Sequence, residues 1–251
     1  HLTLHGTVKE LLALRRFKYL GYCLLGLILL SAAALPAKDQ AWGLRANRLI
    51  RLEKSWPAAS GKAIPPLSKA DLDQDGQLEC LEAEGGSVHI TDCAATVLWR
   101  SPEGWLVPEA FMADLTNDGQ AEAVLLVWRA FRPWPIDRIM KHGGRINSFH
   151  DSKGNSCQVI LIGWHNAAYQ EVWAGSALPK ALSQLTPADL DGDGRLELAT
   201  LESEYDQGRQ GGRLTVWRWQ GFGFSLLDRQ DAWFDKLSLV GEGVEEWLVL
   251  K

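Results

Sequence analysis

Residues 189–197 read DLDGDGRLE, and this stretch decides the predicted fold. Its acidic side chains occupy positions 1, 3, 5 and 9 of a nine-residue frame, as Asp189, Asp191, Asp193 and Glu197. Gly194 at position 6 suits a loop that folds back on itself with a positive φ. Carboxylates at alternate positions of such a loop converge, and Arg195 at position 7 can add its backbone carbonyl. This hard-oxygen cage predicts Ca²⁺ rather than zinc or a redox metal.

The frame occurs again along the chain. Residues 71–79 read DLDQDGQLE, a complete copy, whereas residues 114–122 read DLTNDGQAE and have lost one carboxylate. A fourth copy, residues 238–246, keeps the Gly and the final Glu but has lost its Asp residues. Two complete loops predict two calcium sites, and the variant loop predicts a weaker third. Besides those of residues 189–197, the predicted ligands are Asp71, Asp73, Asp75, Gln77, Glu79, Asp114, Thr116, Asp118, Gln120 and Glu122.

The spacing of the copies predicts a small all-β propeller of four blades. The copies begin at residues 71, 114, 189 and 238, and two of the three steps match the ~40–50 residues of a four-stranded blade. We expect four strands after the first loop, at residues 77–84, 87–91, 95–100 and 105–113, so that each loop and its metal would fix a turn between blades. The longer middle step predicts an insertion at about residues 131–156.

The two ends of the propeller are expected to join in one blade. Residues 42–70 contain strand patterns but no preceding loop, and residues 245–251 form a single strand after the eroded fourth copy. Combining them completes the fourth blade and removes exposed sheet edges.

The chain resembles the FG-GAP / VCBS-type repeats, the integrin-α-like calcium-loop propellers. The resemblance rests on the loops at 71–79 and 189–197 with the variant at 114–122, and it covers about residues 41–251. It implies a calcium-binding propeller, but this fold hosts adhesion, lectin, lipase-like and purely structural proteins. The blade count is lower than in the integrin type.

An apolar run lies ahead of the propeller. Residues 19–35 read YLGYCLLGLILLSAAAL without a charge, and basic residues precede them. We expect an uncleaved transmembrane anchor at residues 17–36, with residues 1–16 cytoplasmic and residues 41–251 outside the cytoplasmic membrane. The alternative is a signal peptide that is cleaved near residues 32–34.

Other patterns are less specific. A net charge of −5 without basic runs argues against nucleic-acid binding. Cys80, Cys93 and Cys157 leave one cysteine over in any single disulfide, and Cys80–Cys93 is the pairing we favour. Trp–Arg pairs recur at strand ends, for example at residues 217–218, where packing or ion pairing of the Arg is expected. The adjacent residues 150–152, HDS, read as a polar turn rather than a catalytic triad.

These patterns together predict a non-catalytic, calcium-stabilised propeller that is anchored in the cell membrane and binds other protein subunits of a membrane complex. Small residues in the predicted anchor, among them Gly21 and Gly26, suit close helix packing against such partners. The alternative is an extracytoplasmic carbohydrate-binding or hydrolytic enzyme domain on the same propeller.

Overall fold

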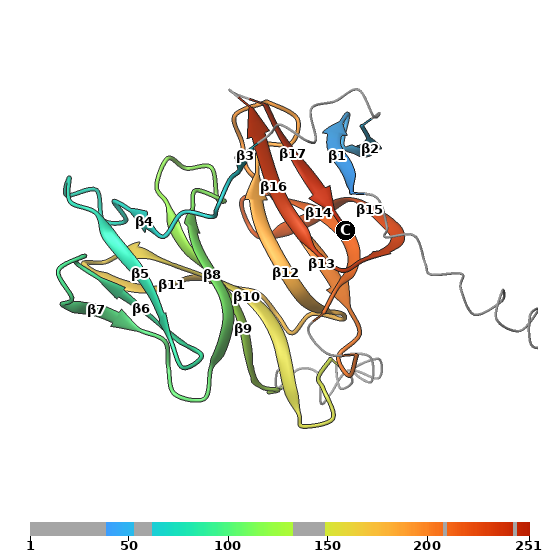
Figure 1. Cartoon of the computed structure of the whole chain (residues 1–251). Helices are drawn as coiled ribbons and strands as arrows, with labels where there is room; N and C mark the ends of the chain where they lie inside the picture. The colour runs from blue at the N-terminus through green and yellow to red at the C-terminus, as the bar shows by residue number, and fades with distance from the viewer. Residues whose placement is uncertain (1–38, 53–61, 133–148, 208–209, 243–244) are drawn as a thin grey trace, which may run out of the picture. The chain divides into compact units, whose positions relative to one another are not determined.

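The structure is a computed structural model that describes residues 39–52, 62–132, 149–207, 210–242 and 245–251. This part of the chain is all-β and forms four antiparallel sheets in a four-bladed propeller arrangement (Figure 1). In these residues no helix has the length and apolarity needed to cross a bilayer. The predicted anchor and cytoplasmic segment, residues 1–36, lie outside the described residues.

Each sheet takes its strands from a nearly continuous stretch of sequence. The first holds β4 (Lys69–Ala70), β5 (Glu79–Glu84), β6 (Ser87–Thr91) and β7 (Val97–Arg100). The second holds β8 (Leu106–Ala113), β9 (Glu122–Ala130), β10 (Asn155–His165) and β11 (Ala168–Ala174). The third holds β12 (Ala181–Ala188), β13 (Glu197–Ser203), β14 (Gly212–Trp219) and β15 (Phe224–Phe234).

The predicted blade boundaries are shifted by one strand relative to the observed sheets. The strand expected to close the first blade is β8, and it pairs with β9 in the second sheet. Each acidic loop therefore joins the first two strands of one sheet instead of two neighbouring blades. The physical reason is that the strands on either side of a short loop form an antiparallel hairpin. In each hairpin an Ala before the loop pairs with the final Glu of the loop, as Ala113 does with Glu122.

The two ends of the described chain complete the fourth sheet, as the sequence predicted. Its order is β2 (Arg48–Arg51), β1 (Gln40–Arg45), β17 (Glu245–Leu250), β16 (Leu237–Glu242) and β3 (Lys62–Ala63). Figure 1 shows the blue N-terminal strands beside the red C-terminal strands, and Trp42 of β1 pairs with Leu248 of β17. The C-terminal part supplies two strands, β16 and β17, and not the single strand that was expected.

The apolar core lies between neighbouring sheets. One cluster joins the first and second sheets, a second joins the second and third, and a third joins the third and fourth. The Leu at position 2 of each acidic loop belongs to one of these clusters, as Leu72, Leu115 and Leu190. Burying this Leu fixes each loop to the junction between two blades by the hydrophobic effect.

A disulfide and a long connection between β9 and β10 complete the fold. Cys80 of β5 forms a disulfide with Cys93, which agrees with the favoured pairing, and Cys157 is buried in β10. The predicted insertion falls between β9 and β10, which pair with each other along their length. Residues 133–148 of this connection lie outside the described residues.

Candidate metal centre

The three acidic loops share one backbone conformation. The glycine at position 6 has φ of +89° in Gly76, +89° in Gly119 and +82° in Gly194, as the sequence predicted. Position 4 is also left-handed, at Gln74, Asn117 and Gly192, which the sequence pattern did not reveal. Asn and Gly tolerate this conformation well, and Gln74 adopts it at a steric cost.

The carboxylate at position 1 holds this conformation in place. Its Oδ2 accepts a hydrogen bond from the backbone N–H of the position-6 glycine, at 3.0 Å from Gly76 to Asp71 and 2.9 Å from Gly119 to Asp114. In the third loop the bond from Gly194 to Asp189 is 3.0 Å long. In the second and third loops the other oxygen, Oδ1, accepts the N–H of the residue at position 5, at 3.1 Å in each.

The final Glu of each loop is buried and closes the loop by a hydrogen bond to its second residue. Its Oε2 accepts the N–H of the Leu at position 2, over 2.6 Å for Glu79, 3.1 Å for Glu122 and 3.0 Å for Glu197. Burial raises the pKa of all three carboxyls, that of Glu122 to about 7. A buried carboxylate needs a compensating charge, and a bound cation would supply one.

The loops bring most of the predicted side-chain ligands together. In each, three carboxylates offer oxygen atoms that lie within 4.8 Å of one another. These groups are Asp71, Asp73 and Glu79; Asp114, Asp118 and Glu122; and Asp189, Asp191 and Glu197. Asp75 and Asp193 lie outside them, and each instead accepts the N–H of the residue two places on. The Thr116 hydroxyl donates to Glu122.

The first loop, residues 71–79, fits a cation best. Asp71 Oδ1 is buried and has no hydrogen-bond partner among the described residues, and the hydroxyl of Tyr169 on β11 is buried beside Glu79 and Asp73. Burial, followed by the charges of Glu79 and Asp73, raises the pKa of Tyr169. A buried carboxylate oxygen without a donor is costly, and Ca²⁺ is the kind of partner that removes this cost. Tyr169 lies far from the loop in sequence, so the motif gave no sign of it.

The third loop, residues 189–197, already contains a cation. Arg218 of β14 donates from Nε to Glu197 Oε1 at 2.8 Å and from Nη2 to Asp191 Oδ2 at 2.7 Å. Burial alone would lower the pKa of Arg218, but these carboxylates raise it beyond its ordinary value. Because Arg218 lies opposite Glu197 in the sheet, its guanidinium neutralises the carboxylates from within the protein.

The counterpart of Arg218 differs in the other two sheets. Register places Gly163 opposite Glu122 in the second sheet, since Ile162 pairs with Ala123. In the first sheet Asp92 follows Thr91, which pairs with Cys80, and so corresponds to the place opposite Glu79. Neither residue can supply a positive charge, so in the described part of the chain this position provides no equivalent of the guanidinium for the first two loops.

Side chains of the loops also connect neighbouring blades. Gln120 Nε2 of the second loop donates to the Leu72 carbonyl in the first. The N–H of Leu196 in the third loop donates to Asn117 Oδ1 in the second, at 3.2 Å. Glu246, the last residue of the eroded fourth copy, accepts the N–H of Asp189 at 2.9 Å. The fourth copy thus keeps a structural contact although it has lost the Asp residues of the frame.

Comparisons with known proteins do not identify the chain. No protein-family model matches it, and none of the curated proteins matches it. The FG-GAP / VCBS interpretation therefore rests on the loops and on the sequence pattern that carries them.

Proposed function

We propose that the protein is a calcium-stabilised, membrane-anchored propeller that binds other proteins as an accessory subunit of a larger membrane complex. Calcium binding is supported by the first loop, where three carboxylates converge and the buried Asp71 Oδ1 has no hydrogen-bond partner among the described residues. The membrane part rests on the apolar run at residues 19–35.

Calcium would have a structural task in this proposal. It would neutralise clustered carboxylates and hold each loop in its left-handed turn, and the loop in turn holds a buried Leu at the blade junction. Asp71, Asp73 and Glu79 would bind it in the first loop, and Asp114, Asp118 and Glu122 in the second. At the third loop Ca²⁺ would have to compete with Arg218.

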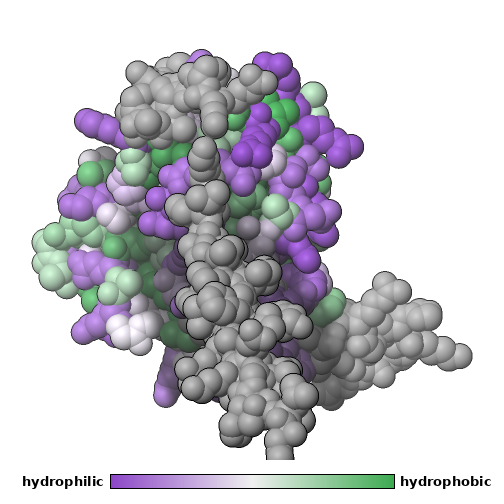
Figure 2. Space-filling model, turned by 45° about the vertical axis from the view of Figure 1, so that its right-hand side comes forward, coloured by the Kyte–Doolittle hydropathy of each residue, from purple (hydrophilic) through white to green (hydrophobic). Residues whose placement is uncertain are grey.

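Exposed apolar side chains on the outermost strands support a protein-binding role. Val97 and Leu98 of β7 are 45% and 42% exposed, and Val172 of β11 is 43% exposed. These strands lie side by side at the outer edges of neighbouring sheets. On the face turned to the viewer, Figure 2 shows hydrophobic groups reaching the surface between hydrophilic ones. A sheet edge with apolar side chains is a surface on which a partner can bury area.

One observation favours carbohydrate binding as a second candidate. A cavity of about 800 Å³ is lined by Trp105, Phe131 and Gln158, among others. Gln158 is buried, and its Oε1 has no hydrogen-bond partner among the described residues. An aromatic wall beside an unsatisfied amide is typical of sugar sites. Glycan binding that is lost in Trp105→Ala would favour this candidate over the scaffold.

Calcium binding is tested by thermal unfolding of the full chain in mild detergent, with added Ca²⁺ or with a chelator. We expect Ca²⁺ to raise the midpoint, because a ligand that binds only the native state stabilises it. Asp71→Asn should remove most of this rise, since it takes away a charged ligand of the first loop.

The matched control for this experiment is Asp231→Asn, which removes the same charge from an exposed position on β15. It should keep the full response to calcium. A midpoint that does not move with Ca²⁺, together with no calcium in elemental analysis, would overturn the proposed metal. The scaffold part is tested separately, by co-purification of stoichiometric partners of the native protein.

A further inference from the structure

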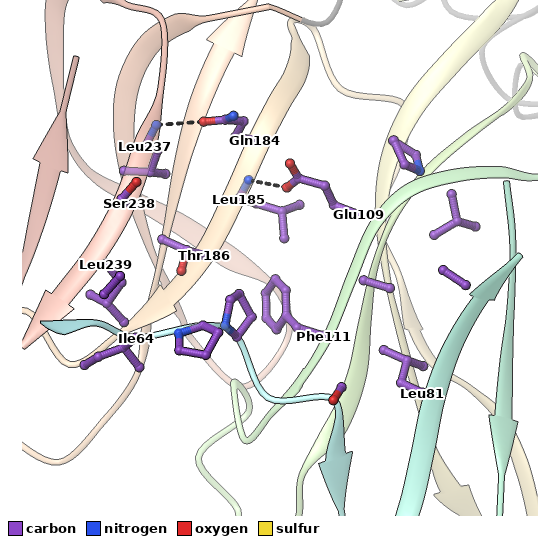
Figure 3. A pocket seen from close by; sticks show the side chains of 18 residues that line it. Ile64, Leu81, Glu109, Phe111, Gln184, Leu185, Thr186, Leu237, Ser238 and Leu239 are labelled. Carbon is purple, nitrogen blue, oxygen red and sulfur yellow. Dashed lines mark hydrogen bonds between the residues drawn. The ribbon is translucent and has the colours of Figure 1, made fainter. Parts of the chain in front are cut away.

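A cavity lies between strands of all four sheets, away from the acidic loops. Its walls come from β5, β8, β12 and β16 and from residues 63–68, which pass from the fourth sheet to the first. Its volume is about 710 Å³, within the ~300–1,000 Å³ that small-molecule sites occupy. Figure 3 shows side chains from these elements facing one another across the cavity.

The segment across this cavity is fixed on both sides. The N–H of Ile64 donates to the carbonyl of Leu239 on β16 at 3.0 Å, and the N–H of Met112 on β8 donates to the carbonyl of Leu67 at 2.7 Å. The walls are therefore preformed by backbone hydrogen bonds, so a ligand would not have to order them.

Glu109 is the only charged residue among the described residues that line the cavity. Its Oε2 accepts the N–H of Leu185 on β12 at 2.8 Å, as Figure 3 shows. Gln184, which also lines the cavity, uses its Oε1 to accept the N–H of Leu237 at 2.7 Å. A carboxylate can accept about four hydrogen bonds, so Glu109 retains acceptor capacity for a ligand.

The surroundings of Glu109 favour a positively charged partner. Its neighbours in the cavity are largely apolar, among them Val107, Phe111 and Leu185. Burial raises the pKa of Glu109 to about 7, although the hydrogen bond from Leu185 opposes this shift. A single carboxylate with apolar walls does not suit Ca²⁺, which takes six to eight oxygen ligands. An organic cation can balance the charge of the Glu109 carboxylate and contact the apolar walls.

We propose that this cavity around Glu109 binds small organic ammonium ions, whose charged nitrogen pairs with Glu109 and whose apolar body contacts Phe111 and Leu185. The pair would form where few competing polar groups are present, which strengthens a charge-assisted hydrogen bond. This site is independent of the proposed calcium loops and of the proposed membrane partners.

The test measures binding of two matched probes, 2-phenylethylammonium and the neutral 2-phenylethanol, to the full chain by titration calorimetry. Saturating Ca²⁺ is present, so that the acidic loops do not attract the ammonium probe. We expect the ammonium ion to bind at least about tenfold more tightly than the alcohol, a difference of about 1.4 kcal/mol. Methylammonium, which lacks the apolar body, should bind more weakly than 2-phenylethylammonium.

Glu109→Gln is the informative variant because its amide oxygen can still accept the Leu185 N–H. It should remove the preference and make the two probes bind alike, whereas Glu103→Gln, at an exposed position, should preserve it. Equal binding of both probes to the unsubstituted chain, or no saturable binding of the ammonium ion, would overturn the proposal without reference to any variant. An ammonium preference that survives in a folded Glu109→Gln protein would overturn it as well.

Discussion

Arg218 makes the three acidic loops unequal in charge. Its side chain is 16% exposed and lies against Glu197, whose side chain is 0% exposed. In the other two loops the corresponding position, Asp92 or Gly163, cannot balance the carboxylates. At the level of single residues, one of the two loops with a complete acidic frame therefore has the least need of calcium.

Arg218→Gln should destabilise the protein by about 3 kcal/mol in the absence of calcium, because it leaves the buried Glu197, and Asp191 beside it, without a counter-charge. Added Ca²⁺ should recover part of this loss, since the vacated carboxylates can then bind the ion. Denaturant unfolding with Ca²⁺ or chelator measures both effects.

The matched control for Arg218 is Arg229→Gln. Arg229 is 54% exposed and lies 4.0 Å from Glu202, so the loss should stay below about 1 kcal/mol and should not depend on calcium. If Arg218→Gln and Arg229→Gln behave alike, the guanidinium does not serve as the cation of the third loop.

Glu109 should make stability depend on pH. Burial raises its folded-state pKa from 4.5 to about 7, so the folded protein holds this proton more tightly than the unfolded chain does. The free energy of unfolding that Glu109 contributes is therefore fully present below pH ~4.5 and is lost as the pH rises through ~7. Glu109→Gln should flatten stability over this range, as measured by urea unfolding at several pH values. The same slope in Glu109→Gln and in the control Glu103→Gln would assign it to other groups.

At the level of strands and loops, the sequence predicted that the strands and turns exist better than it predicted which sheet each strand belongs to. The positive φ of Gly194 and the closure of the sheet by β1 and β17 follow directly from the motif and the strand patterns. The blade boundaries did not, because a loop between two strands has the same sequence whether the strands share a sheet or belong to two. Hairpin pairing of the strands around each loop decides between these arrangements.

The missed residues of the loops share one cause. Tyr169 and Arg218 come from other strands, and their approach depends on register and on packing between blades. Gln120 was predicted to use its backbone carbonyl, yet its side chain also bonds the neighbouring loop. A local motif does not predict contacts between segments that lie far apart in sequence. Only the Trp–Arg pairs hinted at a role for Arg218.

β17 is the strand on which closure depends. It pairs with β1 on one side and β16 on the other, and Trp247 and Leu248 within it are buried. Deleting residues 245–251 should leave two unpaired edges and a cavity in the core, so the protein should unfold or aggregate. Size-exclusion chromatography and thermal unfolding measure this outcome. Glu245→Ala, at an exposed position of the same strand, should have no effect, and a monomeric deletion variant with an unchanged midpoint would show that β17 does not close the fold.

For the whole molecule, the hydrogen bonds between the loops bear on how the propeller unit responds to calcium. Gln120, Asn117 and Glu246 each link a loop to the neighbouring blade. Binding at the first loop would therefore stabilise the junctions around the other loops as well. This linkage suits a rigid module that presents a fixed surface to a partner.

The proposed membrane complex depends on contacts made by the predicted anchor. Gly21, Gly26, Ser31 and Ala32 give the predicted anchor small side chains, which allow helices to approach closely in a bilayer. Gly26→Leu should therefore weaken association with partner helices while leaving the anchor as apolar as before. The measurement is the stoichiometry of proteins that co-purify with the full chain from native membranes in mild detergent.

The control is Leu27→Ile, which changes the shape of a neighbouring apolar residue without removing a small one. It should co-purify partners as the unsubstituted chain does, and the calcium-dependent midpoint of the propeller should be the same in both variants. Loss of partners only in Gly26→Leu would place the contact on the small-residue positions of the anchor. A monomer without stoichiometric partners in the unsubstituted preparation would contradict the subunit proposal, because close helix packing requires a second helix to pack against.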